Sequence, residues 1–187
     1  MQLAWQSTDQ RWIASAGYAW ERGNNAMGQV GTSLALSPFF NPNLNISQQW
    51  GITFAHQANS KIGISAAYAR SKATSRAASS FLGIAMTAAG DSAETQSWML
   101  AVNVNNLIAK GNNAGFGVGG VPTVYSNRSG WGVDGAMPIA LEAWYQWRLT
   151  DSLSITPGAF HISASANKNG FDDGASWGGV IKTQFNF

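Results

Sequence analysis

The final segment of the chain, 175–187, alternates apolar and polar side chains along its whole length. One set of alternate positions begins at Trp177 and ends at Phe185 and Phe187, and Lys182 is the segment's one charged residue. From Trp177 to Phe187 a strand would run roughly 33 Å, or about 23 Å in height at a tilt near 45°. That height matches the apolar band of a membrane-spanning strand, about 25 Å between two aromatic girdles. The segment therefore predicts a transmembrane β-strand. The alternative is the edge of a soluble sheet, which usually carries more blocking charges.

The composition favours the same kind of structure. Charged residues are 11% of the 187 residues, less than half of the roughly 25% found in soluble domains. The mean hydropathy is −0.10, and no stretch approaches the ~20 consecutive apolar residues of a membrane helix. Low charge without long apolar runs is typical of barrel strands, which face lipid on one side and water on the other. The net charge of +2 does not indicate a nucleic-acid partner, and the absence of cysteine excludes disulfides and thiolate metal sites.

Alternation and turn signals divide the chain into about nine strands. The predicted strands are 1–7, 11–20, 48–56, 61–70, 96–104, 114–121, 137–149, 153–164 and 175–187. The connections between them alternate in length. Short turns fall near 8–10, 57–60, 105–113 and 150–152, and long loops near 21–47, 71–94, 122–136 and 165–174. Short turns at one end and long loops at the other are typical of outer-membrane barrels.

Three local features complete the predicted strand map. Pro157 and Gly158 interrupt the strand 153–164 and predict a β-bulge. The Asn- and Gly-rich segment 21–47 is expected to be a surface loop that folds partly into the barrel. The apolar stretch 81–86 is expected to pack on itself or on its neighbours.

The predicted fold class is all-β, a transmembrane antiparallel β-barrel forming one domain over residues 1–187. An ordinary bacterial barrel needs an even number of strands. An open edge in lipid would leave backbone groups unpaired at several kcal/mol each. We therefore expect the chain to be the C-terminal half of a larger barrel, incomplete at its N-terminus. Closure through an unusual strand count or with other copies is the alternative.

The two faces of the predicted strands differ in chemistry. Aromatic residues on the apolar faces predict two membrane girdles: Trp5, Trp12, Trp20, Trp50, Tyr68, Trp98, Trp147, Trp177, Phe185 and Phe187. The opposite faces predict the lining of a water-filled lumen: Arg11, Gln49, Lys61, Asn103, Glu142, Trp144, Gln146, Arg148, Lys182 and Gln184. Cations outnumber anions in this lining, which favours anions or neutral polar solutes. Equally, these side chains could pair with one another or solvate the wall. Trp144 could stack on a sugar ring or pack against an inward-folded loop.

Neither a cofactor site nor catalytic chemistry is predicted. The glycines of 115–120 fit a dinucleotide-binding spacing, but Val121 and Pro122 follow where that motif needs a helix. They therefore indicate strand glycines against a crowded neighbour. His56 and His161 are the only histidines, and no acidic residue lies near His161 in sequence to orient it as a base. The sequence predicts no enzyme, no cofactor and no metal site.

Four stretches in the second half carry a family resemblance. They are 110–122 (KGNNAGFGVGGVP), 141–151 (LEAWYQWRLTD), 155–160 (ITPGAF) and 179–187 (GVIKTQFNF). In this order they resemble the carbohydrate-selective (OprB-type) porin family, in particular its cyanobacterial branch, often called iron-uptake porins. The first half of the chain is similar in strand rhythm only. The resemblance implies a sixteen-stranded outer-membrane barrel.

The expected function follows from the barrel and from the resemblance. We expect passive diffusion of small hydrophilic solutes, carbohydrates and inorganic ions including iron, across the bacterial outer membrane. The expected partners are membrane lipids, the solutes and the barrel assembly machinery, which would bind the C-terminal strand. Porins as a wider class imply a homo-trimer. The alternatives are a structural or adhesive barrel without channel activity and a barrel hydrolase.

Overall fold

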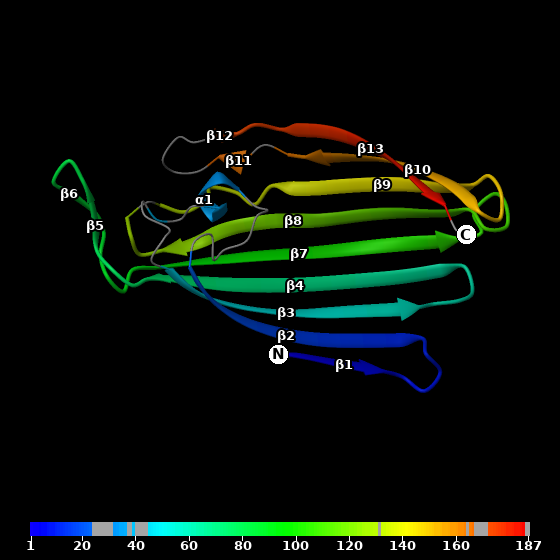
Figure 1. Ribbon diagram of the computed structural model, residues 1–187, viewed down its shortest axis with the longest axis horizontal. Helices are drawn as coiled ribbons and strands as arrows, with labels where there is room; N and C mark the ends of the chain where they lie inside the picture. The colour runs from blue at the N-terminus through cyan, green and yellow to red at the C-terminus, as the bar shows by residue number, and fades with distance from the viewer. Residues whose placement is uncertain are drawn as a thin grey trace.

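One antiparallel sheet makes up most of the structure, a computed structural model that describes residues 1–23, 32–36, 39, 45–130, 132–163, 165–166 and 172–185. Within these residues the sheet has nine strands in the order β1-β2-β3-β4-β7-β8-β9-β10-β13 (Figure 1). The strands are β1 (Gln2–Gln6), β2 (Trp12–Gly23), β3 (Asn45–Gln57), β4 (Ile62–Ser75), β7 (Ser92–Asn105), β8 (Asn113–Asn127), β9 (Ile139–Arg148), β10 (Leu153–Ile162) and β13 (Ser176–Phe185). The predicted all-β class is confirmed. The described sheet does not close on itself, because β1 and β13 form its two edges.

The connections of the sheet differ in length at its two ends. The short turns between β1 and β2, β3 and β4, β7 and β8, and β9 and β10 all lie at one end, on the right in Figure 1. The long connections lie at the other end, as the sequence predicted. We call these the short-turn end and the long-loop end.

The strands run further into the long-loop end than predicted. β4 continues to Ser75, β7 begins at Ser92 and β8 continues to Asn127. Apart from Val124 and Tyr125, their extra residues are small or polar, or proline, and therefore resemble a loop in sequence. Cross-strand pairing holds them in the sheet, as where the hydroxyls of Ser71 and Thr95 lie 2.6 Å apart.

The predicted bulge at Pro157 and Gly158 is wrong. β10 pairs with β13 in unbroken register from Leu153 to Ile162. On the other side, β10 pairs with β9 through Ile155 and again from Gly158 without a shift of register. Proline lacks an N–H, so the strand omits a ladder bond at this point and does not gain a residue.

Two irregularities of register lie in β8 instead. The pairing with β7 shifts between Gln96 and Trp98 and again between Glu94 and Thr95. At each shift β8 carries one extra residue, first around Pro122 and then at Tyr125.

The short elements lie in the long connections. They are α1 (Ser33–Leu36), β5 (Ser79–Phe81), β6 (Ile84–Thr87), β11 (Ser165–Ala166) and β12 (Asp172–Asp173). No helix in the described part of the chain is long and apolar enough to cross a membrane.

A small buried core lies where α1 packs against the sheet. Its members are Leu34, Ala35, Phe39, Ala73, Ala93 and Val124. Ala73, Ala93 and Val124 come from neighbouring strands of the long-loop end and are fully buried. Residues 32–36 and 39 of the predicted loop 21–47 therefore pack on one face of the sheet. The prediction was wrong for 21–23 and 45–47, which belong to β2 and β3.

The apolar stretch 81–86 forms the tip of the β5–β6 hairpin, which projects from the long-loop end in Figure 1. Phe81 is 53% exposed, Leu82 86% and Ile84 66%. The stretch nevertheless pairs with itself, because β5 and β6 form a hairpin in which Phe81 lies opposite Ile84. This agrees with the prediction that it packs on itself, although its apolar side chains stay largely exposed. Leu82 (φ 49°) and Gly83 (φ 79°) both have positive φ and make a tight turn, which aims the apolar side chains away from the sheet.

Candidate functional site

The strand register sorts the side chains of the sheet into two chemically different faces. Residues directly opposite each other in an antiparallel pair point to the same face. One row of such partners runs Trp12, His56, Ile64, Val102, Phe116, Ala143, Ala159 and Gly179. The face carrying this row is called the apolar face, and the opposite one the polar face.

The register puts every residue predicted to line the lumen on the polar face. Eight lie within strands: Gln49, Asn103, Glu142, Trp144, Gln146, Arg148, Lys182 and Gln184. Arg11 and Lys61 lie just before β2 and β4, where their carbonyls accept the N–H of Gln57 at 2.8 Å and of Asn105 at 2.7 Å. These bonds continue the ladders, so that Arg11 and Lys61 share the face of their partners. Their role as a pore lining stays a prediction.

The residues predicted as membrane girdles share the apolar face, except that Phe187 lies outside the described residues. Trp5, Trp12, Trp147 and Phe185 are near the short-turn end, and Trp20, Trp50, Tyr68, Trp98 and Trp177 are nearer the long-loop end. From Trp12 to Trp20 is about 27 Å along the strand. Between the two rows, large apolar side chains such as Ile52 (53%) and Leu100 (49%) are exposed. A continuous exposed apolar face is unusual for a soluble monomer.

The charges of the polar face are unevenly distributed. Arg11, Lys61 and Arg148 all lie at the short-turn end. Glu21, which is not among the predicted lining residues, is the cross-strand partner of Ser47 at the long-loop end. Arg148 forms an ion pair with Asp151 at 2.9 Å. Among the described residues, Arg11, Lys61, Glu142 and Lys182 enter no ion pair. No ion pair among the described residues therefore joins two members of the predicted lining.

The polar side chains around β9 form one connected group. Gln146 accepts a hydrogen bond from the side-chain amide of Asn113 at 2.9 Å and donates one to the hydroxyl of Ser154 at 3.3 Å. Together with Arg148 and Asp151 these residues line a groove of about 290 Å³.

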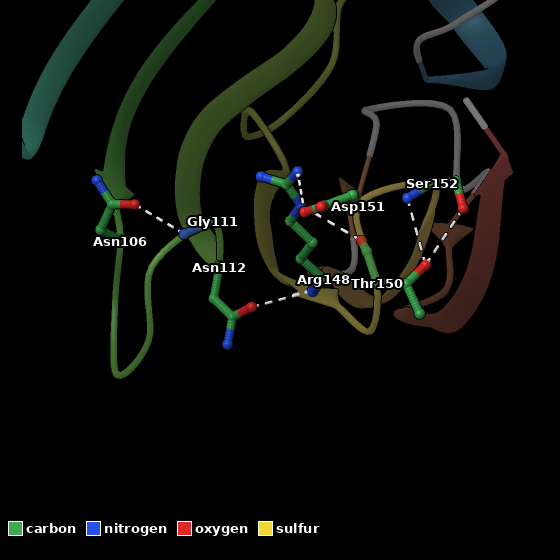
Figure 2. Close-up of polar contacts among 7 residues, drawn as sticks. All are labelled: Asn106, Gly111, Asn112, Arg148, Thr150, Asp151 and Ser152. Atoms are coloured by element: carbon green, nitrogen blue, oxygen red, sulfur yellow. Dashed lines mark hydrogen bonds and ion pairs between the residues drawn. The ribbon is translucent and has the colours of Figure 1, made fainter. Parts of the chain in front are cut away.

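The turns beside this groove are fixed by side chains that bind backbone (Figure 2). Asn106 accepts the N–H of Gly111 at 2.8 Å, and the carbonyl oxygen of the Asn112 amide accepts the N–H of Arg148 at 3.0 Å. The Arg148 guanidinium also donates to the carbonyl of Thr150 at 3.3 Å. Gly111 has φ 88°, and a Cβ there would come within 2.7 Å of the Arg148 side chain. Glycine is therefore required for this turn and for the position of Arg148.

Two large aromatic side chains of the polar face lie against glycines on neighbouring strands. A Cβ at Gly115 would stand 2.4 Å from the indole of Trp144, and a Cβ at Gly178 would stand 2.3 Å from the ring of Phe160. Trp144 is half-buried, and Phe160, the cross-strand partner of Glu142, is 40% exposed. Phe160 is not among the residues predicted to line the lumen. The bulge predicted at Pro157 and Gly158 leaves the face of the residues after it undefined.

A row of small residues makes room on the other half of the polar face. Gly17, Gly51, Ala69 and Ser97 are successive cross-strand partners from β2 to β7. They take part in lining a hollow of about 620 Å³.

Asp134 holds α1 against the polar face at the long-loop end. Its Oδ2 accepts hydrogen bonds from the hydroxyl of Thr32 at 2.8 Å and from the N–H of Val124 at 2.7 Å. The Thr32 hydroxyl in turn accepts the N–H of Ala35 at 3.1 Å, which fixes the first turn of α1. Thr32 and Val124 are both buried, so these bonds form away from water.

The two histidines lie on the apolar face, stacked on tryptophans. His56 stacks on Trp12 with ring centroids 3.6 Å apart, and His161 on Trp177 at 4.0 Å. The described residues contain no group of three or more His, Cys, Asp and Glu that could hold a metal ion.

A comparison with known families decides what this two-faced sheet belongs to. The family described as "Carbohydrate-selective porin, OprB family" matches residues 4–187. The chain belongs to this family. The match covers the first half as well, where the sequence showed only a similar strand rhythm.

Membership of the OprB family confirms two predictions, the outer-membrane location and the assignment to porins and not to enzymes. OprB-family porins reside in the bacterial outer membrane, and so does this protein. The OprB family is a family of porins and not of enzymes, which confirms the prediction that the chain belongs to no enzyme family.

The uncharacterized protein alr4550 of Nostoc sp. (strain PCC 7120 / SAG 25.82 / UTEX 2576) is similar to the chain, with 27% identity over 158 residues. The matched part is 84% of the chain, which spans 24% of that protein. No solved structure matches the chain.

Proposed function

We propose that the sheet is part of the wall of a water-filled outer-membrane barrel through which small hydrophilic solutes, carbohydrates above all, diffuse passively. The observation that carries this proposal is the division of the strands into two faces. The apolar face has two rows of aromatics separated by about one membrane thickness, and the polar face has charged, amide and small side chains.

The two open edges of the sheet, β1 and β13, support the proposal that further strands complete the barrel. In lipid, each backbone group of β1 and β13 without a partner would cost several kcal/mol. Additional strands, from the rest of a longer chain or from other copies, would remove both edges. The sixteen-stranded barrel expected from the resemblance would be one such closure.

Aromatic residues on the polar face support carbohydrate as a solute. Phe160 and Glu142 are cross-strand partners, and Trp144 lies two residues from Glu142 on the same face. Aromatic rings contact the apolar C–H faces of sugars, and a carboxylate accepts hydrogen bonds from their hydroxyls. We infer that Trp144 and Phe160 form a stacking surface with Glu142 at its side.

The cations at the short-turn end support a modest preference for anions over inorganic cations. Arg11, Lys61 and Arg148 lie near that end of the polar face, and Asp151 offsets part of the charge of Arg148. Rings of like charge select ions of the opposite sign at a pore mouth. The passage of iron, a homo-trimer and recognition of β13 by the assembly machinery stay predictions.

The test is conductance and sugar permeation of the full chain in bilayers. We expect open steps with anion preference, and swelling of liposomes in maltose that slows severalfold with Trp144→Ala. Trp147→Ala on the apolar face of the same strand is the matched control and should leave swelling unchanged. The double variant Arg11→Glu and Lys61→Glu should move the reversal potential in a salt gradient toward cation preference.

Two other outcomes would contradict the proposal in different ways. A chain that inserts into bilayers but passes neither ions nor sugars would favour the structural or adhesive alternative. Equal slowing by Trp144→Ala and Trp147→Ala would exclude a specific stacking role for the polar face.

A further inference from the structure

A cluster of charged side chains lies on the apolar face at the long-loop end. Glu94 is 3.9 Å from Arg70 and 3.8 Å from Lys72, and it accepts a hydrogen bond from the Tyr125 hydroxyl at 2.5 Å. The Arg70 guanidinium also contacts that hydroxyl and lies 4.7 Å from the centre of the Tyr125 ring. Two cations and one phenol thus share one carboxylate.

The cluster stands at the level of the aromatic row, not beyond it. Arg70 is the cross-strand partner of Trp50, and Trp50 is the partner of Tyr18. Lys72 and Trp20 are both partners of Gln48. Aromatic rows mark the boundary between hydrocarbon and headgroups, so Arg70 and Lys72 are located where lipid phosphates lie.

The charges of this region do not balance. Arg22 follows Trp20 on the same face and is exposed. On the described part of this surface the three cations Arg22, Arg70 and Lys72 outnumber the one carboxylate, Glu94. The side chains of Arg70 and Lys72 remain 36% and 50% exposed beside Glu94. Their long stems can lie along the apolar face while the charged heads reach the headgroup layer.

The bulge at Tyr125 in β8 places the Tyr125 side chain in the cluster. The extra residue at Tyr125 breaks the simple alternation between Val124, which is buried in the core, and Ser126, which pairs with Glu94. As a result Tyr125 reaches Glu94 on the neighbouring strand β7 and Arg70 on β4, one strand further. An exposed ion pair contributes only about 0–1 kcal/mol to stability. Stability alone therefore does not explain a bulge that makes such specific contacts.

We propose that Arg22, Arg70 and Lys72 form a binding site for the phosphate groups of an anionic glycolipid of the outer leaflet. Glu94 and Tyr125 hold the Arg70 guanidinium in place, and excess positive charge remains for the phosphate. Arginine suits this role because its planar donors match phosphate oxygens in pairs. The long-loop end is the outer side of the membrane, since external loops are the longer ones in such barrels.

The test measures binding of bisphosphorylated lipid A to the full chain in neutral detergent micelles, by native mass spectrometry. We expect Arg70→Gln with Lys72→Gln to weaken binding about 30-fold, because each basic residue near an anionic surface contributes about 1 kcal/mol. Lys110→Gln, which removes a lysine in a turn at the opposite end of the sheet, is the matched control and should leave binding unchanged.

Glu94→Gln separates a lipid site from a purely structural cluster. Glutamine keeps an acceptor oxygen for the Arg70 guanidinium but removes the competing negative charge, so a phosphate site should bind lipid A about fivefold more tightly. A cluster that exists only to stabilise the sheet should instead lose stability and gain no lipid. Arg22→Gln, which lies outside the Glu94 network, should weaken binding about fivefold while strand content by circular dichroism stays unchanged.

Two arms identify the phosphate and its source. Lipid A from which both phosphates have been removed should bind no better than neutral phospholipid, and equal binding would overturn the proposal. Inorganic phosphate at the same concentration should not displace lipid A, and displacement would mean that the site takes free phosphate.

Discussion

The two ends of the sheet differ in the balance of local and long-range contacts that hold them together. At the short-turn end, Asp9, Asn59, Asn106 and Thr150 each accept backbone N–H groups no more than five residues away, and Asn112 accepts the N–H of Arg148, 36 residues away. At the long-loop end, the hydroxyl of Thr32 binds Asp134, which is 102 residues distant. Tyr125 likewise reaches Arg70 across 55 residues and Glu94 across 31.

The local contacts set the register of the strands, whereas the long-range contacts position the groups that we assign to function. Local turns fix the register of each hairpin and therefore the face of every side chain. The long-range contacts then bring α1 onto the polar face and Arg70 against Glu94 on the apolar one. We expect substitutions at the long-loop end to have the larger effects on stability, and those in the short turns the smaller ones.

The largest effect is expected from Asp134→Ala. The substitution leaves the buried N–H of Val124 and the hydroxyl of Thr32 without their acceptor, at about 1–3 kcal/mol for each group. Urea unfolding in micelles should therefore show a loss of about 2–6 kcal/mol. Conductance should also change as α1 leaves the polar face.

Asp151→Ala is the matched control at the short-turn end. It removes an exposed partner of Arg148 and should cost less than about 1 kcal/mol. If the two variants are equally stable, the contrast between the ends is wrong.

An intermediate effect is expected from Gly115→Ala. The new Cβ would overlap the indole of Trp144 at 2.4 Å and should cost about 1–3 kcal/mol, since overpacking forces side chains from their rotamers. The indole should move into the lumen, and single-channel conductance should fall.

Gly17→Ala on the same face meets nothing within 4 Å and should be close to neutral. Combining Gly115→Ala with Trp144→Ala should restore conductance. Persistent low conductance in the double variant would mean that the glycine acts through the backbone and not through Trp144.

The smallest effect is expected at Asp9 in the turn between β1 and β2. The Ser7 hydroxyl donates to Asp9 at 2.5 Å and the Arg11 N–H at 3.1 Å, and these bonds lower the pKa of the carboxyl below its ordinary 3.8. Because the folded-state pKa is lowered, the stabilisation is present above the unfolded-state pKa and is lost as the pH falls through the folded one. An NMR titration of Asp9 should give a midpoint below 3.8, and Ser7→Ala should raise it. A midpoint that Ser7→Ala leaves in place would rule out the hydroxyl as the main cause.

Sequence reasoning recovered the strands wherever the period-two pattern included large apolar residues. The predicted strands 48–56 and 96–104 lie inside β3 and β7, and their predicted faces agree with the register. The pattern failed in 71–75, where both faces are small or polar, because such residues occur equally in loops. It also failed in 122–127, where two bulges break the alternation. The bulge predicted at Pro157 was wrong because a proline that only omits one ladder bond has the same local sequence as a bulge.

The sequence by itself determined which side chains share a face, since alternation follows from the stereochemistry of an extended chain. It also determined the turn positions, because Asp, Asn and Gly favour them locally. Only the tertiary structure decided that Asp134 holds Thr32, that Tyr125 joins Arg70 and Glu94, and that Phe160 stands beside Glu142. These contacts depend on the register of strands far apart in the chain and on single-residue bulges. The two bulges in β8 each shift the register by one residue, and the alternation of apolar and polar side chains does not encode them.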